Sequence, residues 1–286
     1  MSQVHRTVDL HMHSTASDGL FPPAEVVARA HAAGLVAIAL TDHDTIDGLP
    51  AARDAASGTG LRVIAGVELS AMDDEGDELH LLGLHVDDLT VLEAPLAGFR
   101  RMRATRADRM IAQLETVGAT ITRDAVGAIA AGGVIGRPHV ARALVQAKHA
   151  RDLRDAFDRF IGYGRPGYVA KEHFALADAI ALVHEAGGLA VWAHPGSNGS
   201  SDRVQALAAL GLDGVEVFHP SHSTADIERL AMLADAFGLV TSGGSDWHGT
   251  PDPSRQLNCM RVPAVLLSEQ DARVTARRAT AAATPA

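Results

Sequence analysis

Short apolar runs alternate along most of the chain with amphipathic segments of helical length. The seven clearest runs predict strands at Val8–His11, Val36–Thr41, Arg62–Glu68, Glu78–Leu84, Leu189–Ala193, Gly214–Phe218 and Leu239–Ser242. Helices are predicted between several of them, at Ala24–Ala33, Leu176–Ala186, Val204–Leu210 and Ala225–Phe237. This alternation is typical of parallel βαβ units, and about seven strands can close into a barrel. We therefore predict an α/β barrel. The alternative is an open doubly wound sheet, although no glycine-rich dinucleotide loop follows the first strand.

The alternation stops between residues 91 and 164. This stretch predicts only helices, at Phe99–Val117, Arg123–Ala130, Val140–Lys148 and Leu153–Ile161. We predict a barrel formed by residues 1–90 and 165–267, with a small helical subdomain inserted at residues 91–164. Residues 268–286 are rich in alanine, threonine and arginine, and we expect a partly disordered tail there.

The composition of the chain excludes several classes of protein. Of 286 residues, 47% are hydrophobic and 21% charged, which suits a folded protein with one large core. The start of the chain lacks a secretory signal and no apolar run approaches about 20 residues, so we expect a cytoplasmic protein without a membrane partner. The single cysteine, Cys259, excludes an intramolecular disulfide and a multi-cysteine zinc site. It lies in Leu257–Met260, which we predict to be an edge strand.

The charge balance narrows the partners. With 35 acidic and 25 basic residues, the formal net charge is -10, which argues against broad binding to duplex DNA. A short nucleotide held by a few placed cations is still compatible with it. We expect a monomer or a simple homo-oligomer. The 15 histidines are the unusual feature, and their positions carry the chemistry.

Histidines and carboxylates stand at the ends of the predicted strands. The first strand runs into His11-Met12-His13, and residues two apart in an extended chain point to the same side. Taken alone, such a pair could be two exposed histidines. The other strands, however, carry similar residues, namely Thr41-Asp42-His43-Asp44, Glu68, His80, His194 and Asp246-Trp247-His248. In a barrel these ends meet at one mouth, where active sites of this architecture lie.

The types of these residues favour particular metals. Imidazole and carboxylate without thiolate suit Mn, Zn or Fe and disfavour a calcium or magnesium cage. Their number exceeds what one ion needs, and Glu68 has two oxygens with which to bridge ions. We therefore expect two or three divalent metal ions, Mn first.

These motifs, in this order, resemble those of the PHP (polymerase and histidinol phosphatase) family. The resemblance covers Val8 to about Val262 and rests on His11-x-His13, Thr41–Asp44, Gly66–Glu68, His80, Ala193–Pro195 and Ser245-Asp246-x-His248. It is closest to small bacterial phosphoesterases that act on nucleoside 3′,5′-bisphosphates or trim short RNA from its 5′ end. That branch has a distorted (β/α)7 barrel, similar to a TIM barrel, with a helical insertion.

Carried over by position, the resemblance implies three metal sites. The first would use His11, His13, Glu68 and Asp246, the second Glu68, His80 and His194, and the third Asp18, His43 and His248. Asp18 departs from several PHP enzymes that have histidine there, which puts occupancy of the third site in question. Asp44 is a candidate proton acceptor or a partner that orients His43.

Other residues are candidates for contacting the substrate. Gly136-Arg137-Pro138-His139 predicts a helix start, where free N–H groups, a guanidinium and an imidazole can bind an anion, although an ordinary helix start with a surface arginine is the alternative. Members of the resembled branch carry a similar Arg-x-His. Either His219 or His222 could contact phosphate or donate a proton to the leaving oxygen. We favour His222 for the phosphate, leave the role of His219 open, and consider Lys171 a weaker candidate. The arginines of one helix are predicted to form a solvated face, with an RNA-binding track as the alternative, and they are Arg100, Arg101, Arg103, Arg106 and Arg109. The remaining histidines are predicted to be structural or surface residues, and they are His5, His31, His85, His149, His173 and His184.

The expected reaction is hydrolysis of a phosphate monoester of a small nucleotide, for example adenosine 3′,5′-bisphosphate (pAp) to AMP and phosphate. Hydroxide held between two ions would attack phosphorus, with Arg137 offsetting charge on the phosphoryl oxygens. A 5′–3′ exoribonuclease with the same metal centre is the alternative. A metal-dependent C–N hydrolase of the amidohydrolase type is a more distant one, and cleavage of an amide without any phosphate ester would favour it. A non-catalytic metal-binding domain would lack several ligands, whereas every expected position is filled here.

Overall fold

The computed structural model describes residues 6–171 and 174–283. Its centre is an eight-stranded sheet in the order β7-β6-β5-β4-β3-β2-β1-β8. The strands are β1 Thr7–Met12, β2 Ala37–Leu40, β3 Arg62–Met72, β4 Glu78–Leu84, β5 Leu189–Trp192, β6 Gly214–Phe218, β7 Val240–Gly243 and β8 Val262–Pro263. The sheet curls so that the end of β1 meets the segment after β7, where the His13 N–H donates to the Trp247 carbonyl at 2.9 Å. The fold is a mixed α/β, nearly closed and distorted barrel, as predicted.

Two strand predictions need correction. β4 runs antiparallel to both β3 and β5, because the loop between β3 and β4 is too short for a crossover and forms a hairpin. The expected edge strand at Leu257–Met260 is a turn, in which Cys259 is exposed. The edge strand is instead β8, which pairs antiparallel with β1.

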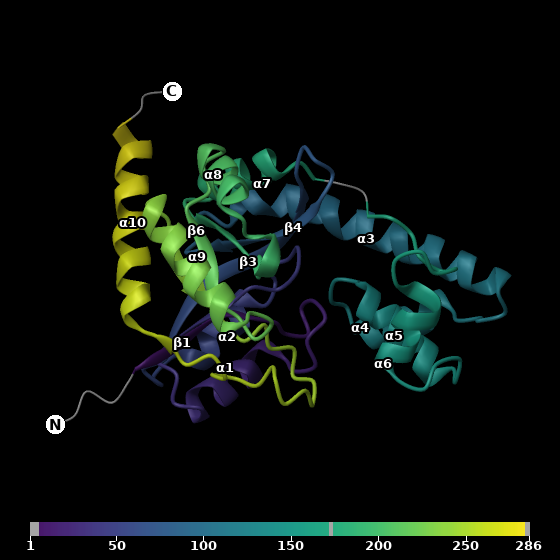
Figure 1. Cartoon of the computed structure of the whole chain (residues 1–286). Coiled ribbons are helices and arrows are strands. Elements are labelled where there is room, and N and C mark those ends of the chain that lie inside the picture. Colours follow the sequence, from purple (N-terminus) through teal and green to yellow (C-terminus); the bar gives the residue numbers. More distant parts are fainter. Residues whose placement is uncertain (1–5, 172–173, 284–286) are drawn as a thin grey trace.

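Helices surround the barrel (Figure 1). Those outside residues 90–161 are α1 Pro23–Ala32, α2 Leu49–Ala56, α7 Leu176–Glu185, the short 3₁₀ helix η2 Gly196–Asn198, α8 Ser201–Ala209, α9 Thr224–Ala236 and α10 Val265–Ala283. The expectation of a disordered tail is wrong for residues 268–283, which belong to α10. Leu267 and Val274 of this helix are buried against the barrel, and Gln270 donates to the Thr241 carbonyl at 2.8 Å. Residues 284–286 lie outside the described part.

Residues 90–161 form helices and contain no strand. They form α3 Thr90–Thr116, α4 Arg123–Ala130, α5 Arg137–Gln146, α6 Leu153–Ala156 and the π-helical turn η1 Phe157–Ile161. In Figure 1 the long α3 leads away from the barrel, and α4 to α6 pack beside it at its far end. Met110, Leu114, Val140 and Leu144 belong to an apolar cluster formed by this segment and Val169. The division into a 1–90 and 165–267 barrel and a 91–164 subdomain stays a prediction.

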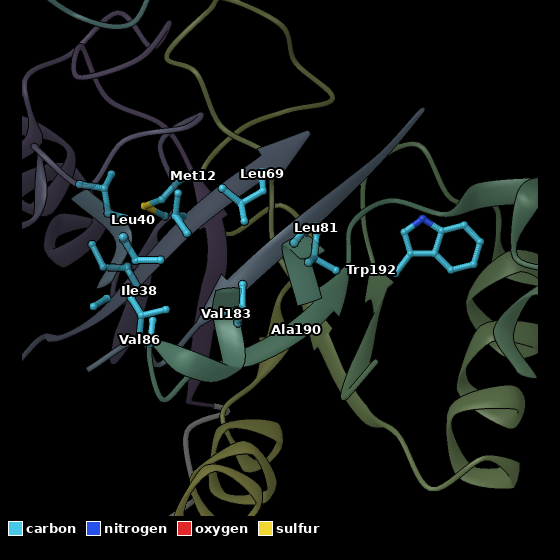
Figure 2. Close-up of a cluster of buried hydrophobic side chains, with 14 of the residues drawn as sticks. Met12, Ile38, Leu40, Leu69, Leu81, Val86, Val183, Ala190 and Trp192 are labelled. Carbon is cyan, nitrogen blue, oxygen red and sulfur yellow. The ribbon is translucent and has the colours of Figure 1, made fainter. Parts of the chain in front are cut away.

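The barrel core explains why the strands hold their register. The largest apolar cluster joins strand residues to the helices outside, for example Leu40 of β2 with Val26 of α1 and Val183 of α7. Figure 2 shows part of it, with Ile38 and Leu40 beside Met12 of β1. Burial of such side chains contributes about 2 kcal/mol each and fixes which face of each strand points outward. In the part of the chain that the structure describes, no helix combines the length and apolar character needed to cross a membrane.

Candidate metal centre

The nine predicted metal ligands come together at one end of the barrel. Three of them lie inside strands, His11 in β1, Glu68 in β3 and His80 in β4, and Asp18 lies in the loop after β1. The other five follow strands β1, β2, β5 and β7, and they are His13, His43, His194, Asp246 and His248. Because β4 runs in the opposite direction, His80 near its amino end lies at the same mouth as the carboxyl ends of the parallel strands. The antiparallel direction that the sequence missed is therefore what brings His80 to the site.

Strand β1 shows how alternation builds the site. Val8 and Leu10 belong to one apolar cluster and Met12 to another, and the register of β1 against β2 shifts between Asp9 and Met12. His11 and His13, on either side of Met12, point away from it toward Glu68 and Asp246. Gly244, after β7, lies so close to β1 that a Cβ atom there would come within 2.5 Å of the His11 backbone nitrogen. Glycine therefore lets the Gly244–His248 segment approach β1 and present its own ligands.

Glu68 is the hub of the cluster. Its Oε2 lies 3.3 Å from His11 Nε2, 3.2 Å from His13 Nε2 and 3.1 Å from His43 Nδ1. Its Oε1 lies 2.7 Å from His80 Nδ1 and 3.3 Å from His194 Nε2. One carboxylate that faces five imidazoles through two oxygens has the arrangement of a bridging ligand.

At the mouth of the barrel, three groups of side chains have ligand atoms close enough for one ion each, within 4.8 Å of one another. They are His11, His13, Glu68 and Asp246; His43, Glu68 and His80; and His13, Asp18, His43 and His248. These resemble the three sets implied by the sequence, with three differences. His13 and His43 each take part in two groups, and His194 lies outside all three although its Nε2 is near Glu68. Asp18 Oδ1 lies 3.2 Å from His248 Nε2, so an aspartate at this position does reach the third group.

Buried atoms without hydrogen-bond partners test whether this centre fits metal ions. Among the described residues, buried side-chain atoms of this kind include His11 Nε2, both ring nitrogens of His13, His43 Nδ1, His80 Nδ1 and Glu68 Oε2. Unpaired buried polar atoms are rare in folded proteins, because each costs about 1–3 kcal/mol. Their convergence on one point is explained by cations that they would coordinate, so the residues fit the ions.

The charges of the cluster agree with cation binding. Burial raises the pKa of the Glu68 carboxyl, but the His43, His80 and His11 rings outweigh it and hold this pKa well below its ordinary value. Burial lowers the pKa of His13, whereas the Asp246 and Glu68 carboxylates outweigh burial and raise this pKa to about 10. A divalent cation can satisfy the same carboxylates in place of that proton.

Backbone strain gathers at the same place. Three residues of the centre that are not glycine have positive φ angles: 52° at Asp44, 33° at His194 and 50° at Asp246. Such conformations cost of order 1 kcal/mol or more each and are common at functional sites. Here they turn the chain sharply at the ends of β2, β5 and β7.

Comparison with known proteins agrees with this geometry. Residues 9–161 match the PHP domain. A 3′,5′-nucleoside bisphosphate phosphatase from Chromobacterium violaceum is 37% identical over 257 residues, which cover 87% of this chain and 90% of the relative. A 5′–3′ exoribonuclease from Haemophilus influenzae is 39% identical over 246 residues, 84% of this chain and 89% of the relative.

The chain belongs to the PHP domain family. A solved structure from Bifidobacterium adolescentis, provisionally described as a metal-dependent phosphoesterase, superposes with a TM-score of 0.87 at 33% identity, over 94% of this chain and 96% of that one. The PHP protein described here is an enzyme, a metal-dependent phosphoesterase. Its cluster of histidines and carboxylates is able to bind metal ions.

The predicted substrate residue Arg137 lies next to the cluster of this PHP enzyme. It is the first residue of α5, with Gly136 as the N-cap. Arg137 lines a pocket of 380 Å³ together with His80 and His194. Among the described residues, no acidic side chain forms an ion pair with Arg137, and the two carboxylates that line the same pocket pair with other cations, Asp77 with Arg203 and Glu78 with Lys171.

His139 has a different surrounding from the one expected of a phosphate ligand. It is buried, and its Nδ1 accepts the Gly136 N–H at 2.9 Å, so the ring caps the start of α5. Burial lowers the pKa of His139, with the Asp18 carboxylate acting in the opposite direction. His139 thereby holds Arg137 in place, and its own contact with phosphate stays a prediction.

His222 and His219 differ in which of their ring nitrogens have partners. His222 Nδ1 donates to the Val217 carbonyl at 2.9 Å and Nε2 accepts the Gly196 N–H at 3.1 Å, which leaves no ring nitrogen free for phosphate. The expected phosphate contact of His222 is therefore not supported. His219 Nδ1 accepts the Ser221 N–H at 3.2 Å, and its Nε2 faces the cluster, 3.6 Å from Asp246 Oδ2.

Asp44 and Lys171 are engaged in ion pairs of the PHP barrel. The Asp44 carboxylate pairs with Arg103 of α3, and the Lys171 amine lies 2.7 Å from Glu78 Oε1. The interpretation of Arg103 as part of a solvated face is wrong, because its side chain is only 11% exposed. Arg101 and Arg109 of the same helix are exposed, as predicted. A role of Asp44 as proton acceptor stays a prediction.

Sequence reasoning assigned no role to several charged residues around the centre. Asp42 accepts hydrogen bonds from the Ser14 N–H, the Ser14 hydroxyl and the Ser17 hydroxyl at 2.6–2.7 Å, and so fixes the loop that carries Asp18. Arg255 pairs with Asp246 and lines the pocket of the cluster. Glu216, inside β6, contacts His11. For Glu216, the signal in the sequence was an acidic residue within an apolar strand.

The remaining histidines have local partners. His85 Nε2 lies 3.1 Å from Gln270 Oε1, His149 Nε2 lies 3.0 Å from the Thr120 carbonyl, and His184 Nε2 lies 2.8 Å from Asp213 Oδ2. His31 is exposed. These surroundings agree with structural or surface roles, and His5 and His173 lie outside the described residues.

Proposed function

We propose that this enzyme hydrolyses a phosphate monoester of a small nucleotide, namely a nucleoside 3′,5′-bisphosphate such as pAp, to release AMP and phosphate. One observation carries the proposal. The 380 Å³ pocket that holds Arg137 shares His80 and His194 with the pocket of the metal cluster. A substrate can thus place one phosphate at the cluster and a second anionic group beside Arg137, within a volume typical of small-molecule sites.

We assign the nine ligands to two or three divalent ions, Mn first and Zn or Fe as alternatives. Such ions, when bound, supply Lewis-acid charge and make a water acidic enough to act as nucleophile near neutral pH. The residues of the chain provide the rest. Arg137 binds a phosphate through charge-assisted hydrogen bonds. Arg255, which pairs with Asp246 Oδ2 and lines the pocket of the cluster, adds a second cation there.

His219 is our candidate for protonating the leaving oxygen. The Ser221 N–H, at 3.2 Å, and the Ser221 hydroxyl, at 2.7 Å, both lie at Nδ1. With Nδ1 accepting from this N–H, a neutral His219 would carry its proton on Nε2. That atom is buried, has no hydrogen-bond partner among the described residues and faces Asp246. A proton held there is directed at the cluster, where the ester bond would break.

An exoribonuclease that trims short 5′-phosphorylated RNA is the second candidate. The Haemophilus influenzae relative, at 39% identity, is named as such an enzyme and supports it. The formal net charge of -10 favours a small substrate over a long polyanion.

The test measures product release by Mn-loaded protein from three substrates: pAp, a 5′-phosphorylated RNA oligomer and AMP. We expect rapid phosphate release from pAp and little from AMP. Arg137→Ala should raise KM for pAp about 10- to 100-fold, as expected for loss of hydrogen bonds to a charged group, whereas Arg101→Ala, an exposed arginine of α3, should not. Mononucleotides released from the oligomer in preference to hydrolysis of pAp would move the assignment to exoribonuclease. Metal-loaded protein that cleaves none of the three would refute the proposal.

A further inference from the structure

Glu216 is a charged residue in a place where charge is costly. It lies in the middle of β6, between Val215 and Val217, and its side chain is fully buried. An ionised carboxylate at such depth is tolerated only when both oxygens have strong partners. No step of the proposed reaction uses this residue, so its partners should indicate its purpose.

Both oxygens of Glu216 contact residues of the metal centre. Oε1 accepts a hydrogen bond from His11 Nδ1 at 3.0 Å. Oε2 accepts the backbone N–H of His194 at 2.7 Å. β5, which leads into His194, is the neighbour of β6 in the sheet, whereas β1, which carries His11, is not. The carboxylate therefore joins two ligand positions that the strand ladder does not join.

The contact with His11 decides which ring nitrogen is free. A proton on Nδ1, donated to Glu216, leaves the lone pair of Nε2 available. His11 Nε2 lies 3.3 Å from Glu68 Oε2 and 3.4 Å from Asp246 Oδ1, so it faces the cluster. In the other tautomer, the N–H at Nε2 would point at the ions. The unprotonated Nδ1 would then face the Glu216 carboxylate, so that two hydrogen-bond acceptors would lie against each other.

The contact with His194 holds a strained turn. His194 has a φ angle of 33°, a backbone conformation that residues other than glycine adopt only at a cost in free energy. The bond from its N–H to Glu216 offsets part of this strain. In this conformation His194 Nε2 lies 3.3 Å from Glu68 Oε1.

We propose that Glu216 is a positioning residue of the metal centre, which fixes the Nδ1-protonated form of His11 and holds the turn at His194 so that both rings present Nε2 to the ions. The inference rests on the proposed metal ligation by these two histidines. It makes Glu216 a determinant of metal affinity that contacts neither metal nor substrate. Carboxylates in this relation to a ligand histidine typically change metal affinity 10- to 100-fold when removed.

The same strand provides a matched control. Asp213, immediately before β6, is also buried, and its Oδ2 accepts a backbone N–H of β5, that of Ala190, at 2.9 Å. It pairs with His184 and Arg277 instead of the metal centre. Glu216→Gln and Asp213→Asn thus each remove one buried carboxylate charge next to β5, and only the first touches predicted ligands.

The experiment titrates Co²⁺ into metal-free protein and records the affinity, the number of ions bound and the visible spectrum of bound Co²⁺. We expect Glu216→Gln to weaken binding about 10- to 100-fold and to alter the spectrum. Asp213→Asn should lower the melting temperature but leave affinity and spectrum unchanged. Unchanged Co²⁺ binding in Glu216→Gln, or equal weakening in both variants, would overturn the inference.

A second measurement needs no variant and so does not depend on Glu216→Gln folding. Nitrogen-15 NMR of the histidine rings in Zn-loaded wild-type protein should show His11 protonated on Nδ1. Protonation on Nε2 would refute the role of Glu216. Neither measurement uses a substrate, so both can be interpreted even if the bisphosphate assay fails. Wild-type protein that binds no Co²⁺ would refute the proposed metal centre as well as the role of Glu216.

Discussion

The amine of Lys171 lies against Glu78 on one side and near the guanidinium of Arg103 on the other. Burial lowers the pKa of Lys171, the Arg103 charge adds to this, and the value is about 8, although Glu78 acts in the opposite direction. Lys171 should therefore carry its charge below pH 8 and lose it above. As a candidate phosphate contact, it would contribute most on the acidic side of that value.

This titration can be measured directly, because the chain has only two lysines, Lys171 and the exposed Lys148. NMR of protein labelled with ¹³C at lysine Cε should give two signals, and Lys148→Arg assigns them. We expect the Lys171 signal to titrate with a midpoint near pH 8. A midpoint close to the ordinary lysine value of about 10.4 would show that the surroundings of Lys171 are misjudged.

At the scale of elements, α10 differs most from what the sequence suggested. Alanine, threonine and arginine without a wide apolar face are typical of a tail. Nevertheless Leu267 and Val274 are buried, and Arg277 and Arg278 of the same helix reach Asp213 and the Gly187 and His85 carbonyls. The helix thus covers the side of the barrel away from the metal centre, near the start of β6.

We expect Val274→Asp to lower the free energy of unfolding by about 3 kcal/mol, because it places a charge in an apolar contact. Ala276→Asp, on the exposed face of the same helix, should change it by less than about 0.5 kcal/mol. Urea denaturation followed by circular dichroism measures both. Equal stability of the two variants would mean that α10 does not pack on the barrel in solution.

At the scale of the whole molecule, the metal centre ties together parts that are distant in sequence. The loop with Asp18 is held by Asp42 of the barrel, and the helical segment reaches it through Val134, whose N–H donates to the Ala16 carbonyl at 2.9 Å, and Arg142, which donates to the Asp18 carbonyl at 2.8 Å. Together with the pair of Arg103 and Asp44, these contacts attach α3 and α5 to the mouth of the barrel. Ions bound at the mouth should therefore stabilise the whole fold.

Metal removal tests this linkage. An ion present at 100 times its dissociation constant stabilises the native state by about 2.7 kcal/mol, so chelation should lower the melting temperature of wild-type protein by several degrees. Glu68→Gln, which alters the carboxylate at the centre of the cluster, should reduce the difference in melting temperature between metal-loaded and chelated protein. Calorimetry with Mn²⁺ and with chelator measures it. Identical melting temperatures in both conditions would contradict metal binding at the described cluster.

The sequence by itself determined the barrel, its strand positions within a few residues and eight of the nine side chains at its mouth, whereas Asp18 was implied only by the resemblance to PHP proteins. It could do so because period-two burial and residues at strand ends are local patterns, and imidazole and carboxylate are the chemistry of metal ligands. Only the tertiary structure decided the direction of β4, the packing of α10, the pair of Arg103 with Asp44 and the contacts of Glu216. Each depends on a partner far away in the chain, for example 205 positions for Glu216 and His11. No local pattern of apolar and polar residues records which distant group a buried charge will meet.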